Sequence, residues 1–241
     1  MSDNLLDVHG VTKRFGGFSA LTRVDLHVKE NERFGLIGPN GSGKTTMINC
    51  ISGALANDEG NIVFAGRDIT KIPAYQRTRL GISRSFQIPK PFVSMTVLEN
   101  LCIPLEYAAH QHSHGVELRG EAMEILELMS MADKADVRTG GLTQIELRKL
   151  ELARAMAAKP KLLISDEAMA GLSNTEVDDI LEILVRLNEQ GLTIIMIEHI
   201  MRAVMNFSER IVVLDAGEKI AEGTPDEIVN NKDVERAYLG A

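Results

Sequence analysis

Residues 38–45 read Gly-Pro-Asn-Gly-Ser-Gly-Lys-Thr, which matches the pattern G-x-x-x-x-G-K-[ST] of a phosphate-binding loop. The residues on both sides give this match its usual context. Residues 33–37 form a short apolar run typical of a strand, and residues 45–51 have the composition of the start of a helix. The stretch therefore predicts a strand, a phosphate-binding loop and a helix in that order, and with them a site for a nucleoside triphosphate.

The residue types in this loop suit the phosphates of a nucleotide. Glycines let the backbone fold around a phosphate with its N–H groups pointing inward, and the following helix adds its positive N-terminal end. Lys44 is expected to reach the β- and γ-phosphates, and the Thr45 hydroxyl to bind Mg²⁺. The alternative, a glycine-rich turn beside a surface lysine, does not account for the flanking strand and helix. The predicted nucleotide-binding residues are Gly38, Asn40, Gly41, Ser42, Gly43, Lys44, Thr45 and Thr46.

Composition places the chain among globular proteins. Its 241 residues are 44% hydrophobic and 25% charged, which is enough for one well-filled α/β domain. The formal charge of −8 argues against general nucleic-acid binding, which usually requires a basic face. We find no apolar run near the roughly 20 residues that span a bilayer and no signal-peptide pattern, so we expect a cytoplasmic protein. Cys50 and Cys102 lie in apolar segments without metal-ligand spacing and are expected to be free thiols.

Hydrophobic patterns divide the chain into three parts. Residues 5–28 alternate as two strands before the phosphate-binding loop. The prolines of residues 88–91 end regular structure, and the block that follows has helical patterns near 117–131 and 143–158 before Pro160 closes it. We therefore expect an α/β fold in which a helical subdomain is inserted into a nucleotide-binding core. The core would comprise residues 1–92 and 160–241, and the helical subdomain residues 93–159.

Several local signals refine this plan. Residues 96–99, 173–176 and 224–227 have the form [ST]-x-x-E, which predicts a capped helix start at each. Residues 192–197 are apolar apart from Thr193 and suit the middle of a parallel sheet. Residues 210–221 read as a hairpin with its turn at Ala216-Gly217.

Hydrolysis of a nucleoside triphosphate needs a metal-holding carboxylate and a group that activates water. Asp166 ends a buried strand and suits the first task, and Glu167 is then placed to accept a proton from the attacking water. His199 follows a later strand and is expected to contact the γ-phosphate, whereas Gln87 is expected to reach Mg²⁺ or water. Phe15 is a candidate to stack on the base, although a lone Phe at a strand end is more often a core residue.

Three histidines, His110, His112 and His114, alternate in a polar segment between predicted helices. Histidines spaced in this way are able to bind a metal ion. Because nothing nearby supplies a fourth ligand, we interpret the segment as a solvated loop without a metal site.

The order of these motifs resembles that of the ATP-binding subunits of ABC transporters, over essentially the whole chain. The matching residues are Phe15, residues 38–46, Gln87, the pair Asp166-Glu167 and His199. Within that family, residues 14–17, 166–172, 197–199 and 237–240 look like the importers of branched-chain amino acids.

That resemblance carries several implications beyond those of the residues themselves. It implies a P-loop NTPase (RecA-like) core with an antiparallel β subdomain and an inserted α-helical subdomain. It implies that ATP and Mg²⁺ are bound and that ATP is hydrolysed to drive solute import. Expected partners are a second ATPase subunit, identical or different, membrane permease subunits and, indirectly, an extracytoplasmic solute-binding protein. The chain would then lie on the inner face of the cell membrane.

Two departures from the family pattern concern contacts across a dimer. The family signature Leu-Ser-Gly-Gly-Gln is replaced by Leu-Thr-Gln-Ile-Glu at residues 142–146. The hydroxyl survives as Thr143, the residue expected to contact nucleotide on the partner subunit, but the glycines that allow close backbone approach are lost. The loop after the Asp166-Glu167 pair usually ends in Asp, and here it ends in Ser173.

Other functions fit the sequence less well. A soluble ABC-type ATPase with a non-transport role would be favoured by tandem fused copies, and this chain carries one. A GTPase switch needs Asn-Lys-x-Asp, whereas residues 231–234 read Asn-Lys-Asp-Val. The altered signature leaves open a protein that binds ATP mainly to hold a partner subunit. The transported solute cannot be read from this chain, because solutes contact other subunits.

Overall fold

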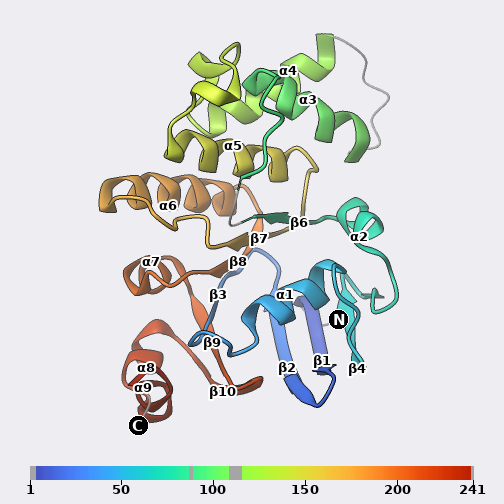
Figure 1. Ribbon diagram of the computed structural model, residues 1–241, viewed down its shortest axis with the longest axis vertical. Coiled ribbons are helices and arrows are strands. Elements are labelled where there is room, and N and C mark those ends of the chain that lie inside the picture. The colour runs from blue at the N-terminus through green and yellow to red at the C-terminus, as the bar shows by residue number, and fades with distance from the viewer. Residues whose placement is uncertain (1–3, 87–88, 109–115, 240–241) are drawn as a thin grey trace.

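A computed structural model describes residues 4–86, 89–108 and 116–239 of the chain. Its strands form two sheets, one of four strands and one of six (Figure 1). In chain order the strands are β1 Asn4–Phe15, β2 Phe18–Lys29, β3 Arg33–Ile37, β4 Glu59–Phe64, β5 Arg67–Asp68, β6 Ile82–Ser85, β7 Leu162–Asp166, β8 Thr193–Ile197, β9 Arg210–Asp215 and β10 Glu218–Gly223.

Helices connect these strands and cover the sheets. The α-helices are α1 Lys44–Ser52, α2 Ala74–Leu80, α3 Val97–Ala108, α4 Val116–Leu128, α5 Gln144–Met156, α6 Asn174–Glu189, α7 Met201–Phe207, α8 Pro225–Val229 and α9 Lys232–Leu239. Two short 3₁₀ turns, Ala132–Lys134 and Thr139–Gly141, lie between α4 and α5. None of the helices in the described residues is both long and apolar enough to span a bilayer.

The six-stranded sheet holds the centre of the molecule in the order β10-β9-β3-β8-β7-β6. Strands β9, β3, β8, β7 and β6 are parallel, and β10 pairs antiparallel with β9. β7 and β8 are buried at every residue, because helices or the second sheet cover both of their faces. The largely apolar segment 192–197 therefore predicted the position of β8 correctly.

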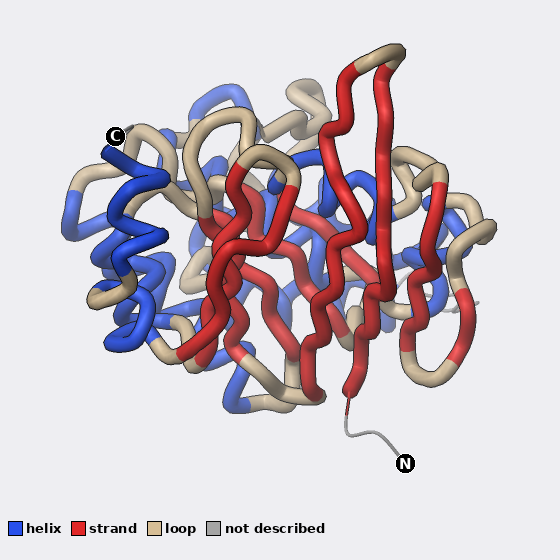
Figure 2. The backbone as a smooth tube through the Cα atoms, turned by 90° about the horizontal axis from the view of Figure 1, so that it is seen from below, coloured by secondary structure: helices blue, strands red, loops and turns tan. Residues whose placement is uncertain are grey.

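The second sheet is antiparallel, in the order β2-β1-β4-β5. Its apolar side chains join those of α1 and one face of the six-stranded sheet in a single core, which includes Leu6, Phe34, Ile48, Ile51 and Ile164. The helix that follows the phosphate-binding loop thus has its apolar side chains inside this core. Figure 2 shows the strand-rich side of the molecule, with the N-terminal end and the last helix on opposite sides.

The other face of the six-stranded sheet packs against helices. Apolar residues of α3 to α9 share a second core with this face, including Leu101, Leu126, Leu152, Ile183 and Met196. Helices α3, α4 and α5 occur between β6 and β7 in the chain and gather at one end of the molecule (Figure 1). All three helices lie within residues 93–159, the segment that we propose as the helical subdomain.

The predicted capped helix starts are confirmed. Thr96 pairs with Glu99, Ser173 with Glu176 and Thr224 with Glu227, each through reciprocal hydrogen bonds. Element ends differ from expectation by a few residues: the helices expected near 117–131 and 143–158 are α4 Val116–Leu128 and α5 Gln144–Met156. Helices α2 and α7 were missed, and α9 was not predicted as a helix separate from α8. The α9 sequence has a strong apolar stripe but is only 8 residues long, too short for periodicity alone to identify.

Candidate functional site

The carboxyl ends of three parallel strands supply the site. The phosphate-binding loop follows β3, Glu167 follows β7 and His199 comes shortly after β8. Because the carboxyl ends of parallel strands share one edge of the sheet, residues far apart in sequence meet there. They line a cavity of about 320 Å³ formed by Phe15, Phe18, Ala20, Asn40, Gly41, Ser42, Gly43, Lys44, Thr45, Thr46, Glu167 and His199.

The loop backbone is fixed by a close approach at Gly43. This residue has a φ of 105°, and a Cβ there would lie 2.7 Å from the carbonyl oxygen of Ala20. Only glycine fits such a position without strain. Gly43 is also the N-cap of α1 and provides no side-chain cap, so the first N–H groups of the helix are left to a ligand.

Lys44 is folded back onto the loop. Its Nζ donates to the carbonyl oxygens of Gly38, at 2.7 Å, and Pro39, at 3.0 Å. Burial lowers the pKa of Lys44, while the carboxylates of Glu167 and Asp166 act in the opposite direction. The ammonium group is thus held at the loop beside two acidic side chains.

Glu167 and His199 form a pair within the cavity. His199 Nε2 lies 2.9 Å from Glu167 Oε1. Glu167 has a φ of 49°, a left-handed conformation that non-glycine residues seldom adopt, and such conformations cluster at functional sites. Its backbone N–H donates to the carbonyl of Ile197 at 2.9 Å, so the residue stays tied to β8 while its side chain enters the cavity.

Asp166 lies next to a second cavity of about 460 Å³, which Thr45 and Glu167 also line. Its Oδ2 accepts a hydrogen bond of 2.6 Å from Arg84, and Arg84 also donates to the Asn49 side chain at 2.7 Å. Within the described ranges, no cluster of three or more His, Cys, Asp or Glu side chains surrounds a common point. A buried carboxylate and a hydroxyl at one cavity nevertheless suit Mg²⁺, which takes few protein ligands when it binds with phosphates.

Two aromatic rings flank the mouth of the first cavity. Phe15 and Phe18 are 51% and 63% exposed, which is unusual for core residues. They are cross-strand partners at the end of the β1–β2 hairpin, and Lys13 lies over the Phe15 ring at 5.6 Å. Phe18 was not among the residues predicted from the sequence, although its place across a two-residue turn from Phe15 was a usable signal.

Thr143 lies outside this cavity, at the N-cap of α5. Its hydroxyl accepts from the Glu146 backbone N–H, and the Glu146 carboxylate accepts from the Thr143 N–H at 2.8 Å. Glu146 also forms a 3.0 Å ion pair with Lys134. The hydrogen bond from the Thr143 N–H has the largest effect in lowering the pKa of Glu146, and the contact with Lys134 lowers this pKa further. The altered segment is therefore a well-formed helix start whose acidic side chain is partly neutralised.

Several residues near the site had no sequence signal. Arg84 was not anticipated as the partner of Asp166. Glu198 is almost fully buried beside the site, and its Oε1 accepts a hydrogen bond from the Met169 N–H at 2.8 Å.

Four residues singled out in the sequence, Gln87, His110, His112 and His114, lie outside the described residues.

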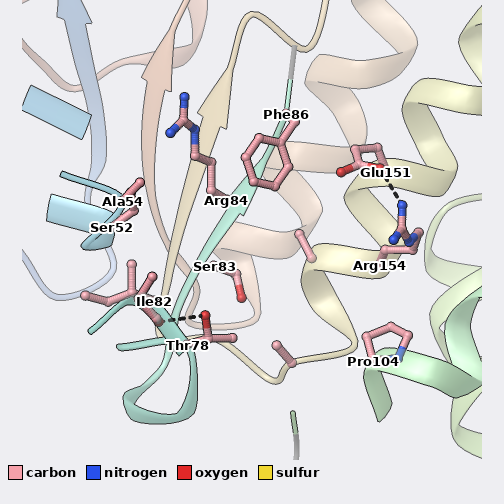
Figure 3. A pocket seen from close by; sticks show the side chains of 13 residues that line it. Ser52, Ala54, Thr78, Ile82, Ser83, Arg84, Phe86, Pro104, Glu151 and Arg154 are labelled. Carbon is pink, nitrogen blue, oxygen red and sulfur yellow. Dashed lines mark hydrogen bonds and ion pairs between the residues drawn. The ribbon is translucent and has the colours of Figure 1, made fainter. Parts of the chain in front are cut away.

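A third cavity, of about 290 Å³, opens between the sheet and the helices (Figure 3). Arg84 of β6 and Phe86 just after it line this cavity, together with Glu151 and Arg154 of α5. Arg154 donates to Glu151 Oε2 at 3.0 Å and lies over the Phe92 ring at 5.4 Å. Burial raises the pKa of Glu151.

Comparison with known proteins gives consistent matches over the whole chain. Residues 21–170 match the family model of the ABC transporter, and residues 218–241 match that of the branched-chain amino acid ATP-binding cassette transporter. A Pseudomonas aeruginosa protein described as high-affinity branched-chain amino acid transport ATP-binding protein BraF is 38% identical over 257 aligned residues. The alignment covers 100% of this chain and 99% of the relative.

Solved structures share the same fold. The ADP conformation of MJ1267, an ATP-binding cassette of an ABC transporter, superposes with a TM-score of 0.90 at 33% identity and covers 100% of both chains. The dimeric structure of MJ0796, a bacterial ABC transporter cassette, gives a TM-score of 0.83 at 28% identity, covering 91% of this chain and 98% of that one.

A parallel sheet with a phosphate-binding loop after β3 and acidic residues after β7 defines a P-loop nucleoside triphosphatase. The length of the matches then decides the family. The chain belongs to the ABC transporter family, as one of its ATP-binding cassettes.

Proposed function

We propose that this chain binds ATP in the 320 Å³ cavity and hydrolyses it there with Glu167 as general base. The observation that carries the proposal is the meeting of the phosphate-binding loop, the aromatic rings and the Glu167–His199 pair around one cavity. The rings of Phe15 and Phe18 would stack on the base. Loop N–H groups and Lys44 would hold the phosphates at the opposite end.

Each polar residue has a distinct task in this scheme. Lys44 would balance the charge of the β- and γ-phosphates. In the structure its Nζ donates to the carbonyl oxygens of Gly38 and Pro39, which carry no full charge. Glu167 accepts a proton from the water that attacks the γ-phosphate. His199 holds the Glu167 carboxylate by the 2.9 Å contact, which keeps the carboxylate aimed into the cavity.

Mg²⁺ would be held by the Thr45 hydroxyl and the Asp166 carboxylate, with Gln87 as a further candidate ligand. Bound there, the ion would neutralise charge that builds up on the phosphates. Arg84 pairs with Asp166 in the structure, so the Asp166 carboxylate would face both the Arg84 guanidinium group and the metal ion.

Glu167→Gln tests the assignment of the base. The amide keeps the size and hydrogen bonding of the carboxylate but does not take up the proton from water. We expect ATP affinity within about threefold of the parent and turnover reduced about 100-fold or more. Phosphate release and fluorescent-nucleotide titration measure the two effects. Turnover within a few-fold of the parent would show that another group is the base.

We further propose that ATP hydrolysis by this chain drives import of branched-chain amino acids or related small solutes. The family match at residues 218–241 and the relative from Pseudomonas aeruginosa support this substrate class. In this scheme the chain lies on the inner face of the membrane and pairs with a second ATPase subunit, whose Thr143 segment or equivalent closes the ATP site. An extracytoplasmic solute-binding protein delivers the solute.

The cavity in Figure 3 is our proposed docking place for the permease. It combines exposed apolar surface, such as Phe86, with the charged pair Glu151–Arg154, and it borders the Asp166 cavity through Arg84 and Phe86. A permease segment seated there would contact residues next to the nucleotide site.

A further inference from the structure

Arg84 lies at the point where three elements of the nucleotide site meet. From β6, its Nη2 donates to Asp166 Oδ2 at the end of β7, and its Nη1 donates to Asn49 Oδ1 on α1, at 2.6 and 2.7 Å. The side chains of Arg84 and Asp166 are 12% and 9% exposed, so the pair is largely shielded from water. Figure 3 shows Arg84 beside Phe86, whose ring centre lies 5.3 Å from the guanidinium carbon. The guanidinium group is therefore held by an anion, an amide and an aromatic ring.

These contacts connect Arg84 to the two residues that we propose as Mg²⁺ ligands, Thr45 and Asp166. Asn49 comes four residues after Thr45 on α1, about one helical turn along, so the two side chains lie on the same side of the helix. Arg84, Thr45 and Asp166 also line the same 460 Å³ cavity. A positive charge that belongs to the protein thus lies beside the place where the metal ion would bind.

This position affects the charge that the phosphates of ATP would meet. Where a carboxylate is balanced by a metal ion alone, removal of the ion leaves the carboxylate facing the phosphates, and like charges in a partly buried site repel strongly. Here Asp166 has a guanidinium group of the protein at 2.6 Å. Arg84 therefore supplies for Asp166 part of the charge balance that would otherwise come from the metal ion.

We propose that Arg84 is a positioning and charge-balancing residue of the ATP site, through which this chain binds ATP tightly without Mg²⁺ and needs the ion for hydrolysis. The proposal rests on the assignment of the ATP site and of Asp166 given above. Without the guanidinium group, the Asp166 carboxylate would repel the phosphates unless Mg²⁺ were bound. The dependence of ATP affinity on Mg²⁺ should therefore be weak in the parent and strong in a variant that lacks this charge.

Arg84→Gln is the direct test, because glutamine can still donate a hydrogen bond to Asp166 but carries no charge. Arg84→Lys keeps the charge and loses the forked shape of the side chain. Arg33→Gln is the matched control, since it also removes an arginine from a salt bridge, with Glu209, but at the end of β3 opposite the phosphate-binding loop. Fluorescent-nucleotide titration of each protein, once with excess Mg²⁺ and once with EDTA, gives two values of Kd.

For the parent, Arg33→Gln and Arg84→Lys, we expect the Kd in EDTA to lie within about tenfold of the Kd with Mg²⁺. For Arg84→Gln the ratio of the two Kd values should be at least about tenfold larger than in the parent, while the Kd with Mg²⁺ changes less than about threefold. A ratio equal to that of the parent overturns the inference. Equal weakening in both buffers does so too, because general damage to the site would have that effect. An Arg84→Lys ratio as large as that of Arg84→Gln would show that the charge is not what matters.

Two further measurements do not depend on the folding of Arg84→Gln. In the unsubstituted protein, a Kd that rises more than about tenfold when EDTA replaces Mg²⁺ contradicts the inference directly. The double variant Arg84→Gln/Asp166→Asn leaves neither charge of the pair buried without its partner, so it should bind ATP in EDTA within about threefold of the parent. Binding by the double variant that is about tenfold weaker than this also contradicts the inference.

Lys44→Ala, measured in parallel, separates this inference from the proposed function. Tight ATP binding by that variant in both buffers would refute the ATP site itself. If ATP binding with Mg²⁺ requires Lys44 but the ratio of Kd values does not respond to Arg84→Gln, the ATP site stands and the role of Arg84 is refuted.

Discussion

Glu198 shows what a single buried carboxylate does at this site. It is 2% exposed, and burial raises its pKa to about 7, with the carboxylate of Glu167 adding to the effect. Hydrogen bonds from the N–H groups of Met169 and His199 and the charge of Arg148 act in the opposite direction. Glu198 thus connects the loop after β7 to the end of β8 through the Met169 N–H. Its burial disfavours the ionised form of its own carboxyl group.

The pKa shift predicts how stability depends on pH. Between pH 4.5 and 7 the unfolded chain loses the Glu198 proton while the folded chain keeps it, so this residue lowers stability as pH rises to about 7. Glu198→Gln keeps an acceptor for the Met169 N–H and removes the titration. Its unfolding free energy relative to the parent should therefore rise by about 3 kcal/mol between pH 4.5 and pH 8.

Urea unfolding at both pH values measures this difference. A stability difference between variant and parent that is the same at both pH values would show that Glu198 titrates normally.

Among single residues, those of a local motif were predictable from the sequence, and those that act through a distant partner were not. The residues of the phosphate-binding loop were predictable, because a loop of eight consecutive residues carries its chemistry locally. Arg84 and Glu198 were not, because each acts through a partner on another element, at Asp166 and Met169 respectively. Pairings of this kind depend on the sheet order and leave no pattern in the sequence.

At the scale of elements, the segment 142–146 combines a changed sequence with a regular helix start. It starts α5 with a complete capping box, yet Ile145 puts a β-branched side chain where the family signature has glycine. In an ATP sandwich that side chain would crowd the partner's γ-phosphate. We therefore expect the isolated chain to be mostly monomeric and slow in hydrolysis.

Replacing residues 144–146 by Gly-Gly-Gln tests this expectation. Glutamine can retain the capping box with Thr143, so α5 should still form, with a modest loss of Tm from the two glycines. Hydrolysis should rise in the chain that retains Glu167, as measured by phosphate release. ATP-dependent dimerisation should rise most visibly in the Glu167→Gln background, as measured by light scattering. Glu146→Gln alone is the control, since it removes the charge and leaves Ile145 in place. A fall in both activities would mean that the native segment is a working variant.

Elements were predicted well where their pattern was long or capped. The strands around the phosphate-binding loop and the helices that begin at Ser173 and Thr224 follow from local signals. α2 was missed because its 7 residues are too few to show a helical period. Its buried residue is Arg77, and a charged side chain gives no hydrophobic signal. Arg77 donates to the carbonyls of Cys50 and Ile51 and so satisfies the end of α1, a tertiary role that hydrophobic patterning does not reveal.

For the whole molecule, the proposed docking cavity makes a further prediction. Ala54 lines this cavity and is exposed, whereas Ala56, two residues later, is exposed but does not line it. Ala54→Glu should fill the cavity with a charged side chain and abolish solute uptake by cells that carry the complete transporter. ATP binding by the isolated chain should be unchanged.

Ala56→Glu is the matched control and should leave uptake intact. Normal uptake by the Ala54→Glu variant, assembled at normal levels, would place the permease contact elsewhere.

The position of β3 in the sheet has a consequence for synthesis of the chain. β3 pairs on one side with residues 194–196 of β8 and on the other with residues 210–213 of β9. Both partners leave the ribosome long after β3, roughly 10 to 30 seconds later at usual elongation rates. During that time the apolar residues of β3 have no strand neighbours in their final sheet. In the nascent chain the apolar β3 segment therefore stays unpaired, and prone to aggregation, until β8 and β9 have been synthesised. Chaperones that bind such segments should contact this protein throughout most of its translation.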